Sequence, residues 1–443
     1  YHASKSYVSK LLHAGKKIAI CEQISLPKGG KGIADRQIVE ILTPGSLLEE
    51  DFLDQKSNNY LMSIAKTKEF VSISYADSST GDFYATSFSA DSLITKIREE
   101  ISRIKPKEIL IQDSLLEEKA IGRELFEQND LLINRFPDWS FSQESSVERL
   151  KEQFNVINLK GFGLRDGDPA LFSTGVLLEY LRENANNLLP QVRDLVRYDE
   201  NDILTLDEWT NKNLEITQNM YDGSRKFTLL EVIDHTKTST GARRLKHWVT
   251  HPLQAIEAIE QRQHRTDTLY RNQMVLASLR EILGSILDIE RLATRVVTER
   301  AHAKDLLALR NSIDGIFSIE KVLDDWELND RFWTTSSEVT EKITTIYNTL
   351  RCSIAEDPST VLNEGNLIKT GYSEELDQLR ELKTNSQKIL NDYLKIEKKN
   401  SGITSLKIKY NKIIGYFLEV TKSNVHLVPE HFIRRQSLVG SER

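Results

Sequence analysis

The sequence predicts a multidomain protein of mixed α and β structure, with a large all-helical part between α/β units and a small β-rich end. Three observations lead to this expectation. Short apolar runs of strand type alternate with helical patterns up to about residue 170. From there to Lys399, apolar spacings of three and four residues dominate. After Asn400-Ser401-Gly402 apolar and polar residues alternate, as in a β-hairpin.

Composition favours a globular protein without a disulfide framework. The chain has 443 residues, of which 39% are hydrophobic and 28% charged, which is enough for several cores. Its two cysteines, Cys21 and Cys352, are far apart in sequence and favour a reducing compartment. No run approaches the roughly 18 apolar residues of a membrane span. We therefore expect a cytoplasmic protein that does not enter a membrane.

The first unit is expected to be a small α/β unit. Residues 4–14 have the apolar spacing of a short helix, and residues 18–21 read as a buried strand. A glycine-rich loop at 27–32 leads to a second strand at 37–42. The chain opens at Tyr1 without a methionine and closes within an unfinished pattern, so we expect a segment of a longer protein.

The second unit is expected to contain a partly parallel sheet. Residues 70–77 and 83–88 read as two strands joined by a Ser/Thr/Gly turn. A helix with apolar residues between Leu93 and Ile104 follows, and then a strand at 108–111. Strands that alternate with helices predict an α/β arrangement, which the glycines near residue 165 bring to an end.

The long third part reads as helical throughout. Segments at 253–283, 286–298 and 302–324 have helical periodicity, and one last helix is expected from Glu374 to about Lys399. Its apolar residues form a narrow seam, which we interpret as the core of a helical bundle.

The last 45 residues are basic in an otherwise acidic chain. Residues 399–443 carry eight Lys/Arg and three Glu, a net charge of +5, whereas the whole chain has −7. Cations and polar side chains on loops beside a sheet suit contact with nucleic-acid phosphates. The candidate DNA-binding residues are Lys422, Ser423, Asn424, Arg434, Arg435 and Gln436. The alternative is a solvated hairpin whose arginines pair with local carboxylates.

A second candidate site is a group of carboxylates in the α/β unit. A strand that ends in Asp77, a turn with Asp82 and a return strand resemble the opening of an RNase H-like fold. Together with Glu108 and Asp113, these acids could be proposed as the metal ligands of a nuclease. Asp82 beside a glycine is also an ordinary turn residue, and turn chemistry is the favoured interpretation. The chain has no phosphate-loop motif and no Ser/His/Asp signature, so we expect no catalytic residue, cofactor or metal in it.

Several blocks along the whole chain match the pattern of one family. They are Tyr1-His2-Ala3, Cys21-Glu22-Gln23, Arg36-Gln37-Ile38-Val39, Thr43-Pro44-Gly45, Asn213-Leu214-Glu215-Ile216, Thr228 to Asp234, Thr240 to Trp248, Leu406 to Asn411, Gly415-Tyr416-Phe417 and Arg434 to Leu438. In this order they resemble the MutS proteins of DNA mismatch repair. Blocks that are in register over the chain are more specific than one short motif.

The resemblance implies a domain layout. Residues 1–60 would end the mismatch-binding domain, and residues 61–170 would form an RNase H-like connector without nuclease activity. Residues 171–399 would form the helical core with long lever helices, and residues 400–443 the first part of a DNA clamp. The Phe-x-Glu motif that reads the mismatch is expected upstream of Tyr1. The ATPase domain, with ATP and magnesium, is expected beyond Arg443.

The implied function is recognition of mismatched base pairs, which initiates repair, with the clamp on the DNA backbone. The implied partners are double-stranded DNA with mismatches or small loops, a second copy of the parent protein and a MutL-type repair protein, in the nucleoid. Two alternatives stay open. One is a metal-dependent nuclease of RNase H-like type, and the other is a helical protein-interaction scaffold, including a recombination-type relative of MutS.

Overall fold

The computed structural model describes residues 4–24, 35–118, 120–122, 131–184, 189–199, 203–328, 332, 336–360, 364–411, 415–437 and 440–442. The loop predicted at 27–32 and the turn residue Lys412 lie outside these ranges. The chain combines many helices with several sheets and divides into two compact units, Tyr1–Arg351 and Cys352–Arg443. Among the described helices, none has the length and apolar character needed to cross a membrane.

The chain begins with helix α1 (Ser4–His13) and an antiparallel ribbon of β1 (Ile18–Gln23) and β2 (Arg36–Leu42). Leu12, Leu42 and Leu47 form a small core beneath the helix. The expectation of a buried strand at 18–21 is wrong, because the side chains of β1 are mostly exposed. A ribbon of two strands has only one neighbour per strand, so the apolar residues of β1 do not indicate burial on both faces.

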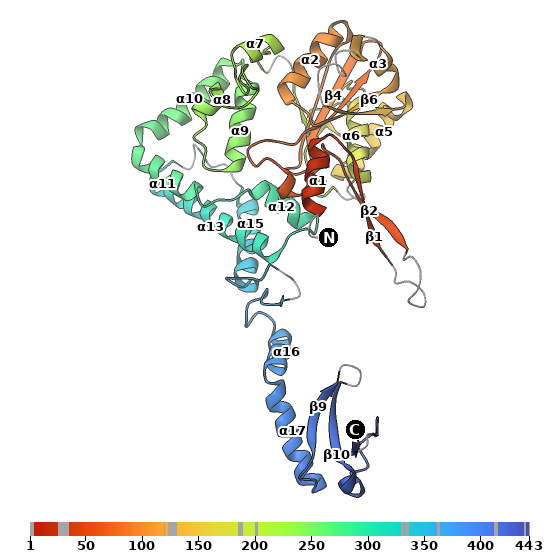
Figure 1. The fold of residues 1–443 in the computed structure, drawn as a ribbon. Helices are drawn as coiled ribbons and strands as arrows, with labels where there is room; N and C mark the ends of the chain where they lie inside the picture. Colours follow the sequence, from red (N-terminus) through yellow and green to blue (C-terminus); the bar gives the residue numbers. More distant parts are fainter. Residues whose placement is uncertain are drawn as a thin grey trace. The chain divides into compact units, whose positions relative to one another are not determined.

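A six-stranded mixed sheet dominates the next part of the chain (Figure 1). Its strands are β3 (Leu61–Lys66), β4 (Phe70–Asp77), β5 (Asp82–Ser89), β6 (Glu108–Gln112), β7 (Leu132–Phe136) and β8 (Val196–Arg197), in the order β7-β6-β3-β4-β5-β8. The pairs β3–β4 and β4–β5 are antiparallel, whereas β6 lies parallel to β3 and β7 parallel to β6. The predicted partly parallel sheet is therefore confirmed.

Helices cover both faces of this sheet. One core joins Ile64, Ile73 and Tyr75 to the buried face of α2 (Leu93–Ile104). The other joins the opposite face to α5 (Gln143–Phe154) and α6 (Leu171–Asn184). Helix α6 packs on the sheet although it lies beyond residue 170, the predicted end of this unit. The domain boundaries stay predictions.

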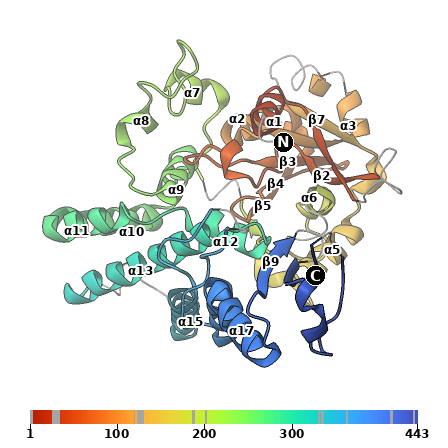
Figure 2. The same ribbon diagram turned by 60° about the horizontal axis from the view of Figure 1, so that its bottom comes forward.

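Most of the remaining first unit is helical (Figure 2). Its helices are α7 (Glu208–Asn213), α8 (Leu229–Ile233), α9 (Ser239–Thr250), α10 (Ile256–Arg271), α11 (Gln273–Leu283), α12 (Ile289–Val297), α13 (Ala303–Asp325) and α15 (Ser337–Ser353). Helix α13 packs against α11 and α12. Buried Val275, Leu279 and Leu323 form a core there.

Arginines of α12 attach the helical part to the segment that precedes the sheet. Arg291 is 2% exposed and donates to the carbonyl oxygens of Asp54 and Ser57, both at 2.9 Å. Arg295 pairs with Glu50 at 2.7 Å. Buried guanidinium groups need fixed acceptors, so these contacts define how the segment at 50–58 lies against α12.

The second unit contains α16 (Glu374–Thr384), α17 (Ser386–Ser401), β9 (Lys407–Asn411), β10 (Gly415–Thr421), the short 3-10 helix η8 (Lys422–Leu427) and β11 (Ser441–Glu442). The single last helix expected from Glu374 is wrong, because the helix is interrupted at Asn385. The Ser386 hydroxyl donates to the Lys383 carbonyl, a local bond that competes with helical pairing. The seam interpreted as bundle core is exposed, with Leu379, Leu382, Ile389, Tyr393 and Ile396 each more than 40% accessible.

Candidate nucleic-acid interface

The basic end of the chain folds as a hairpin against the end of α17. Strands β9 and β10 pair antiparallel, with Tyr410 opposite Tyr416 and Ile408 opposite Leu418. Ile403, Leu406 and Val420 form its buried core, and Leu394 of α17 packs against them. Gly402 ends α17 in the left-handed region, at φ 71°, which a glycine adopts without strain. The hairpin is thus a small module with a core of its own.

The structure brings the two predicted DNA-binding segments to one strand. Lys422, Ser423 and Asn424 are the first residues of η8. The last two residues of β10, which directly precede η8, pair with β11. The Lys422 amide donates to the Gly440 carbonyl at 3.2 Å. Arg434 pairs with Glu442 of β11 at 2.9 Å. The two segments, ten residues apart in the sequence, therefore flank the same short strand.

The six predicted residues differ in what they can still bind. Lys422 and Arg435 are exposed, and neither has an ion-pair partner among the described residues. Arg434 is held by Glu442 and by the Ser437 hydroxyl. Asn424 donates to the Ser405 hydroxyl at 2.8 Å, and the Ser423 hydroxyl lies 3.2 Å from that of Thr421. Gln436 is exposed. Lys422 and Arg435 are thus the cations best placed to contact phosphate.

An exposed tyrosine pair on the hairpin was missed from the sequence. Tyr410 is 62% and Tyr416 is 57% exposed, and their ring centroids lie 5.1 Å apart. The pairing of 405–410 with 416–420 across a short turn could have indicated it, because opposite residues of a hairpin lie close together. The sequence also contains one Phe-x-Glu triplet, which ends at Glu419 in β10. The Glu419 carboxylate forms an ion pair with Lys409 of the neighbouring strand β9 at 2.8 Å.

The carboxylates of the nuclease alternative are held by protein donors. Asp77 is buried and accepts hydrogen bonds from the Asn59 amide and from the Ser79 amide and hydroxyl. Asp82 shares the Asn58 side-chain amide with Asp77 and accepts a bond from Thr80. Burial raises the pKa of Asp82 to about 6. These two acids therefore stabilise the turn between β4 and β5, as turn residues do.

The other two carboxylates lie in different surroundings. Glu108 is buried and accepts bonds from the Gly45 amide, the Asn134 side chain and the Tyr180 hydroxyl. Asp113 pairs with Arg135 at 2.9 Å. Within the described ranges, no three His, Cys, Asp or Glu side chains are grouped as a metal site requires. Nothing in this geometry favours the nuclease alternative.

Comparison with known proteins identifies three consecutive domains. Residues 1–51 match the family model of MutS domain I, residues 59–193 match MutS domain II, and residues 209–419 match MutS domain III. The DNA mismatch repair protein MutS of Treponema denticola is 40% identical over the whole chain. The proteins of the same name from Treponema pallidum and Halothermothrix orenii are each 36% identical over the whole chain.

These relatives are longer than this chain. The alignments cover 100% of the chain but 51%, 49% and 49% of the three relatives. The chain therefore spans about half the length of the curated proteins it matches.

Proposed function

Because this chain belongs to the MutS family of DNA mismatch-repair proteins, we propose that it provides the DNA-backbone grip with which such a protein recognises mismatched base pairs and initiates repair. The contact is made by Lys422 and Arg435, supported by the other four predicted residues. The observation that carries this proposal is the exposure of these two cations, without carboxylate partners in the described part of the chain, on either side of β11.

Phosphate contact is the chemistry that suits these residues. Lysine and arginine neutralise phosphates and release counterions, an interaction that does not depend on base sequence. Arg434 has less charge to offer a phosphate, because its guanidinium is paired with Glu442. The exposed rings of Tyr410 and Tyr416 add a flat apolar surface on the same hairpin, which can lie against the sugars of the backbone.

We propose roles for the other domains of the chain and of the parent protein as well. Residues 61–170, with strands β3 to β7 of the sheet, would be the connector of RNase H-like type, and residues 171–399 the core and lever. The parent protein would act as a homodimer in the nucleoid, with a MutL-type partner. ATP and magnesium would act in a domain that lies beyond this chain. The assignment of the sheet rests on its antiparallel β3–β4–β5 order followed by parallel β6 and β7.

A salt series of DNA binding tests the grip. We expect the double variant Lys422→Ala/Arg435→Ala to bind duplex DNA more weakly and to lower the slope of log affinity against log salt by up to about two. The measurement is fluorescence anisotropy with a labelled duplex and the 443-residue chain. Each removed cation ends one phosphate contact, so the loss should be similar for every DNA sequence.

The matched control removes one lysine and one arginine from the first unit. Lys160 and Arg165 are exposed, and their loss changes net charge by the same amount as the double variant. The Lys160→Ala/Arg165→Ala protein should keep the original slope. Equal slopes for all three proteins would show that Lys422 and Arg435 do not contact DNA phosphates.

A further inference from the structure

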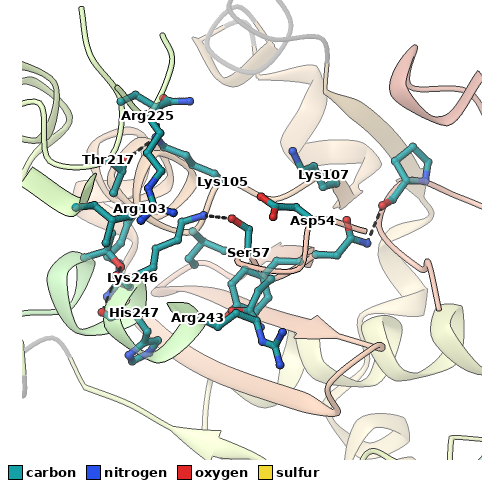
Figure 3. A pocket seen from close by; sticks show the side chains of 18 of the residues that line it. Asp54, Ser57, Arg103, Lys105, Lys107, Thr217, Arg225, Arg243, Lys246 and His247 are labelled. Atoms are coloured by element: carbon teal, nitrogen blue, oxygen red, sulfur yellow. Dashed lines mark hydrogen bonds between the residues drawn. The ribbon is translucent and has the colours of Figure 1, made fainter. Parts of the chain in front are cut away.

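A cavity of about 510 Å³ lies in the first unit, beside the segment before β3, the end of α2 and helices α8 and α9 (Figure 3). Its wall is strongly basic. The cationic lining residues are Arg103, Lys105, Lys107, Arg225, Arg243 and Lys246. Asp54 is the one acidic residue among the described residues of this wall. A wall of this composition attracts an anion.

The three arginines of the wall are already neutralised. Arg103 is bound by Glu100, Arg225 by Asp234, and Arg243 by Asp288 and Glu290. Planar guanidinium groups paired with carboxylates in this way serve the fold. They add little to the unbalanced charge of the cavity, which must come from the lysines.

The three lysines have no such partners. The Lys105 ammonium donates to Thr217 Oγ1 at 3.0 Å and to Gln218 Oε1 at 2.6 Å. The Lys246 ammonium donates to Ser57 Oγ at 3.1 Å. Lys107 makes no side-chain hydrogen bond in the described structure, and no described carboxylate lies within ion-pair distance of any of the three. Each ammonium has three donors, so donors remain available for a ligand.

The positive charges of the lysines also repel one another. Burial, with Lys246 and Lys107 nearby, lowers the pKa of Lys105 to about 8. Burial also lowers the pKa of Lys246, where Asp54 opposes the effect and Lys107 and Arg225 add to it. In the same wall, His251 Nε2 is buried without a hydrogen-bond partner. The wall thus has three lysines without carboxylate partners and one carboxylate, Asp54, so about two positive charges are not balanced.

We propose that this cavity binds a small phosphate compound with at least two negative charges, through Lys105, Lys107 and Lys246. Ammonium groups bind phosphate as point charges, and a diphosphate has enough oxygens to accept from all three. The volume falls within the roughly 300–1,000 Å³ typical of small-molecule sites. Apolar Leu47, Phe52 and Tyr60 line another part of the wall, where an organic group attached to the phosphate can pack.

This site is independent of the DNA grip. It lies in the first unit, whereas all six predicted DNA-binding residues lie in the second. Loss of Lys422 and Arg435 therefore leaves it intact, and its failure would not affect the proposed function.

Isothermal titration of the 443-residue chain with sodium pyrophosphate, at constant ionic strength, tests the proposal. We expect saturable binding with one ion per chain. The Lys105→Gln/Lys246→Gln variant should bind about a hundredfold more weakly, because each charged hydrogen bond contributes roughly tenfold. Lys160→Gln, which removes an exposed lysine outside the cavity, should bind as the unchanged chain does.

Thermal unfolding separates a ligand site from a structural role. Without pyrophosphate, Lys246→Gln should unfold at the same or a higher temperature, because it relieves repulsion between cations. With pyrophosphate, only the unchanged chain and the control should gain stability. The exposed Lys107→Gln variant gives the same comparison if the double variant does not fold.

Three results would overturn the proposal. They are the absence of saturable binding at millimolar pyrophosphate, equal binding by the double variant and the control, and tight binding of single-stranded oligonucleotide without any binding of pyrophosphate. The second result would indicate diffuse charge attraction. The third would assign the cavity to a nucleic-acid strand if Lys105→Gln/Lys246→Gln loses the oligonucleotide binding and Lys422→Ala/Arg435→Ala keeps it.

Discussion

The carboxylates of Asp77 and Asp82 show how burial and hydrogen bonds affect single residues in this protein. Asp77 and Asp82 lie at the turn between β4 and β5 and share the Asn58 side-chain amide. Asp77 has two further donors from Ser79, whereas the environment of Asp82 is dominated by burial, which raises its pKa from 3.8 to about 6. A raised carboxyl pKa means that the folded state prefers the protonated form.

The contribution of Asp82 to the stability of the folded protein should therefore be lost as the pH rises from about 3.8 to about 6. Well below pH 3.8 the carboxyl is protonated in both states, and between about pH 3.8 and 6 the unfolded chain releases its proton whereas the folded chain largely retains it. Asp82→Asn keeps an acceptor for Asn58 and Thr80 without the charge. We expect the variant to be more stable than the unchanged chain at pH 8, by at most about 3 kcal/mol, and nearly equal at pH 4.

The check is thermal unfolding of both proteins across this pH range. Asp166→Asn, at an exposed position, serves as the control and should follow the unchanged chain at every pH. A difference between Asp82→Asn and the unchanged chain that does not vary with pH would contradict the assignment to ionisation.

At residue scale, the sequence predicts six DNA-binding residues but not which of them are paired within the protein. Lys422 and Arg435 were predicted as DNA contacts from charge and loop position, and they are exposed. The pairing of Arg434 with Glu442 matches, for this one residue, the alternative that the arginines pair with local carboxylates. The partner could not be named from the sequence, because the pair depends on β11, a strand of two residues without any periodic signal. The basic cavity was missed because Lys105 and Lys246 are 141 positions apart and meet only through the tertiary fold.

At the scale of elements, the packing of helices α5 and α6 depends on one glycine. Helices α5 and α6 pack together on the sheet, and a Cβ on Gly175 would lie 2.1 Å from Ser146 Oγ and 2.7 Å from Ser146 Cα. Neither distance is sterically possible, and the second involves the backbone. The absence of a side chain at Gly175 therefore sets the distance between the two helices.

We expect Gly175→Ala to destabilise the protein by about 1–3 kcal/mol, because the helices must move apart in a packed core. This loss opposes the higher helix propensity of alanine, which alone would stabilise by about 1 kcal/mol. Gly161→Ala is the control, since nothing lies within 4 Å of a Cβ there. Urea unfolding followed by circular dichroism measures both. A stabilised Gly175→Ala protein would mean that α5 and α6 do not approach so closely.

Elements with strong periodicity were predicted well, and the others were not. The strands expected at 70–77 and 83–88 match β4 and β5 to within one residue at each end. Strand β3 was missed, because its sequence Leu-Met-Ser-Ile-Ala-Lys is rich in residues that favour helices and is stabilised by pairing on both sides. The interruption at Asn385 was missed because local hydrogen bonds, rather than apolar spacing, end α16.

At the scale of the whole molecule, charge is distributed unevenly along the chain. Residues 399–443 carry a net charge of +5, although the chain as a whole carries −7. The net charge therefore disfavours contact with DNA while one module favours it. Binding should depend on that module and should be weakened by salt, which screens short-range phosphate contacts and removes the benefit of counterion release.

Because the proposed contacts are to phosphates, we expect this chain to bind matched and mismatched duplexes equally. Contacts to phosphate position a protein on DNA but do not read bases, and phosphate contact is the interaction proposed for Lys422 and Arg435. Parallel salt series with a matched and a single-mismatch duplex, followed by fluorescence anisotropy, should give the same affinity and slope. A preference of more than about tenfold for the mismatch, which corresponds to about 1.4 kcal/mol, would place base readout within these 443 residues. The exposed Tyr410 and Tyr416 would then be the first side chains to replace, because aromatic rings are the groups here that can stack on an unpaired base.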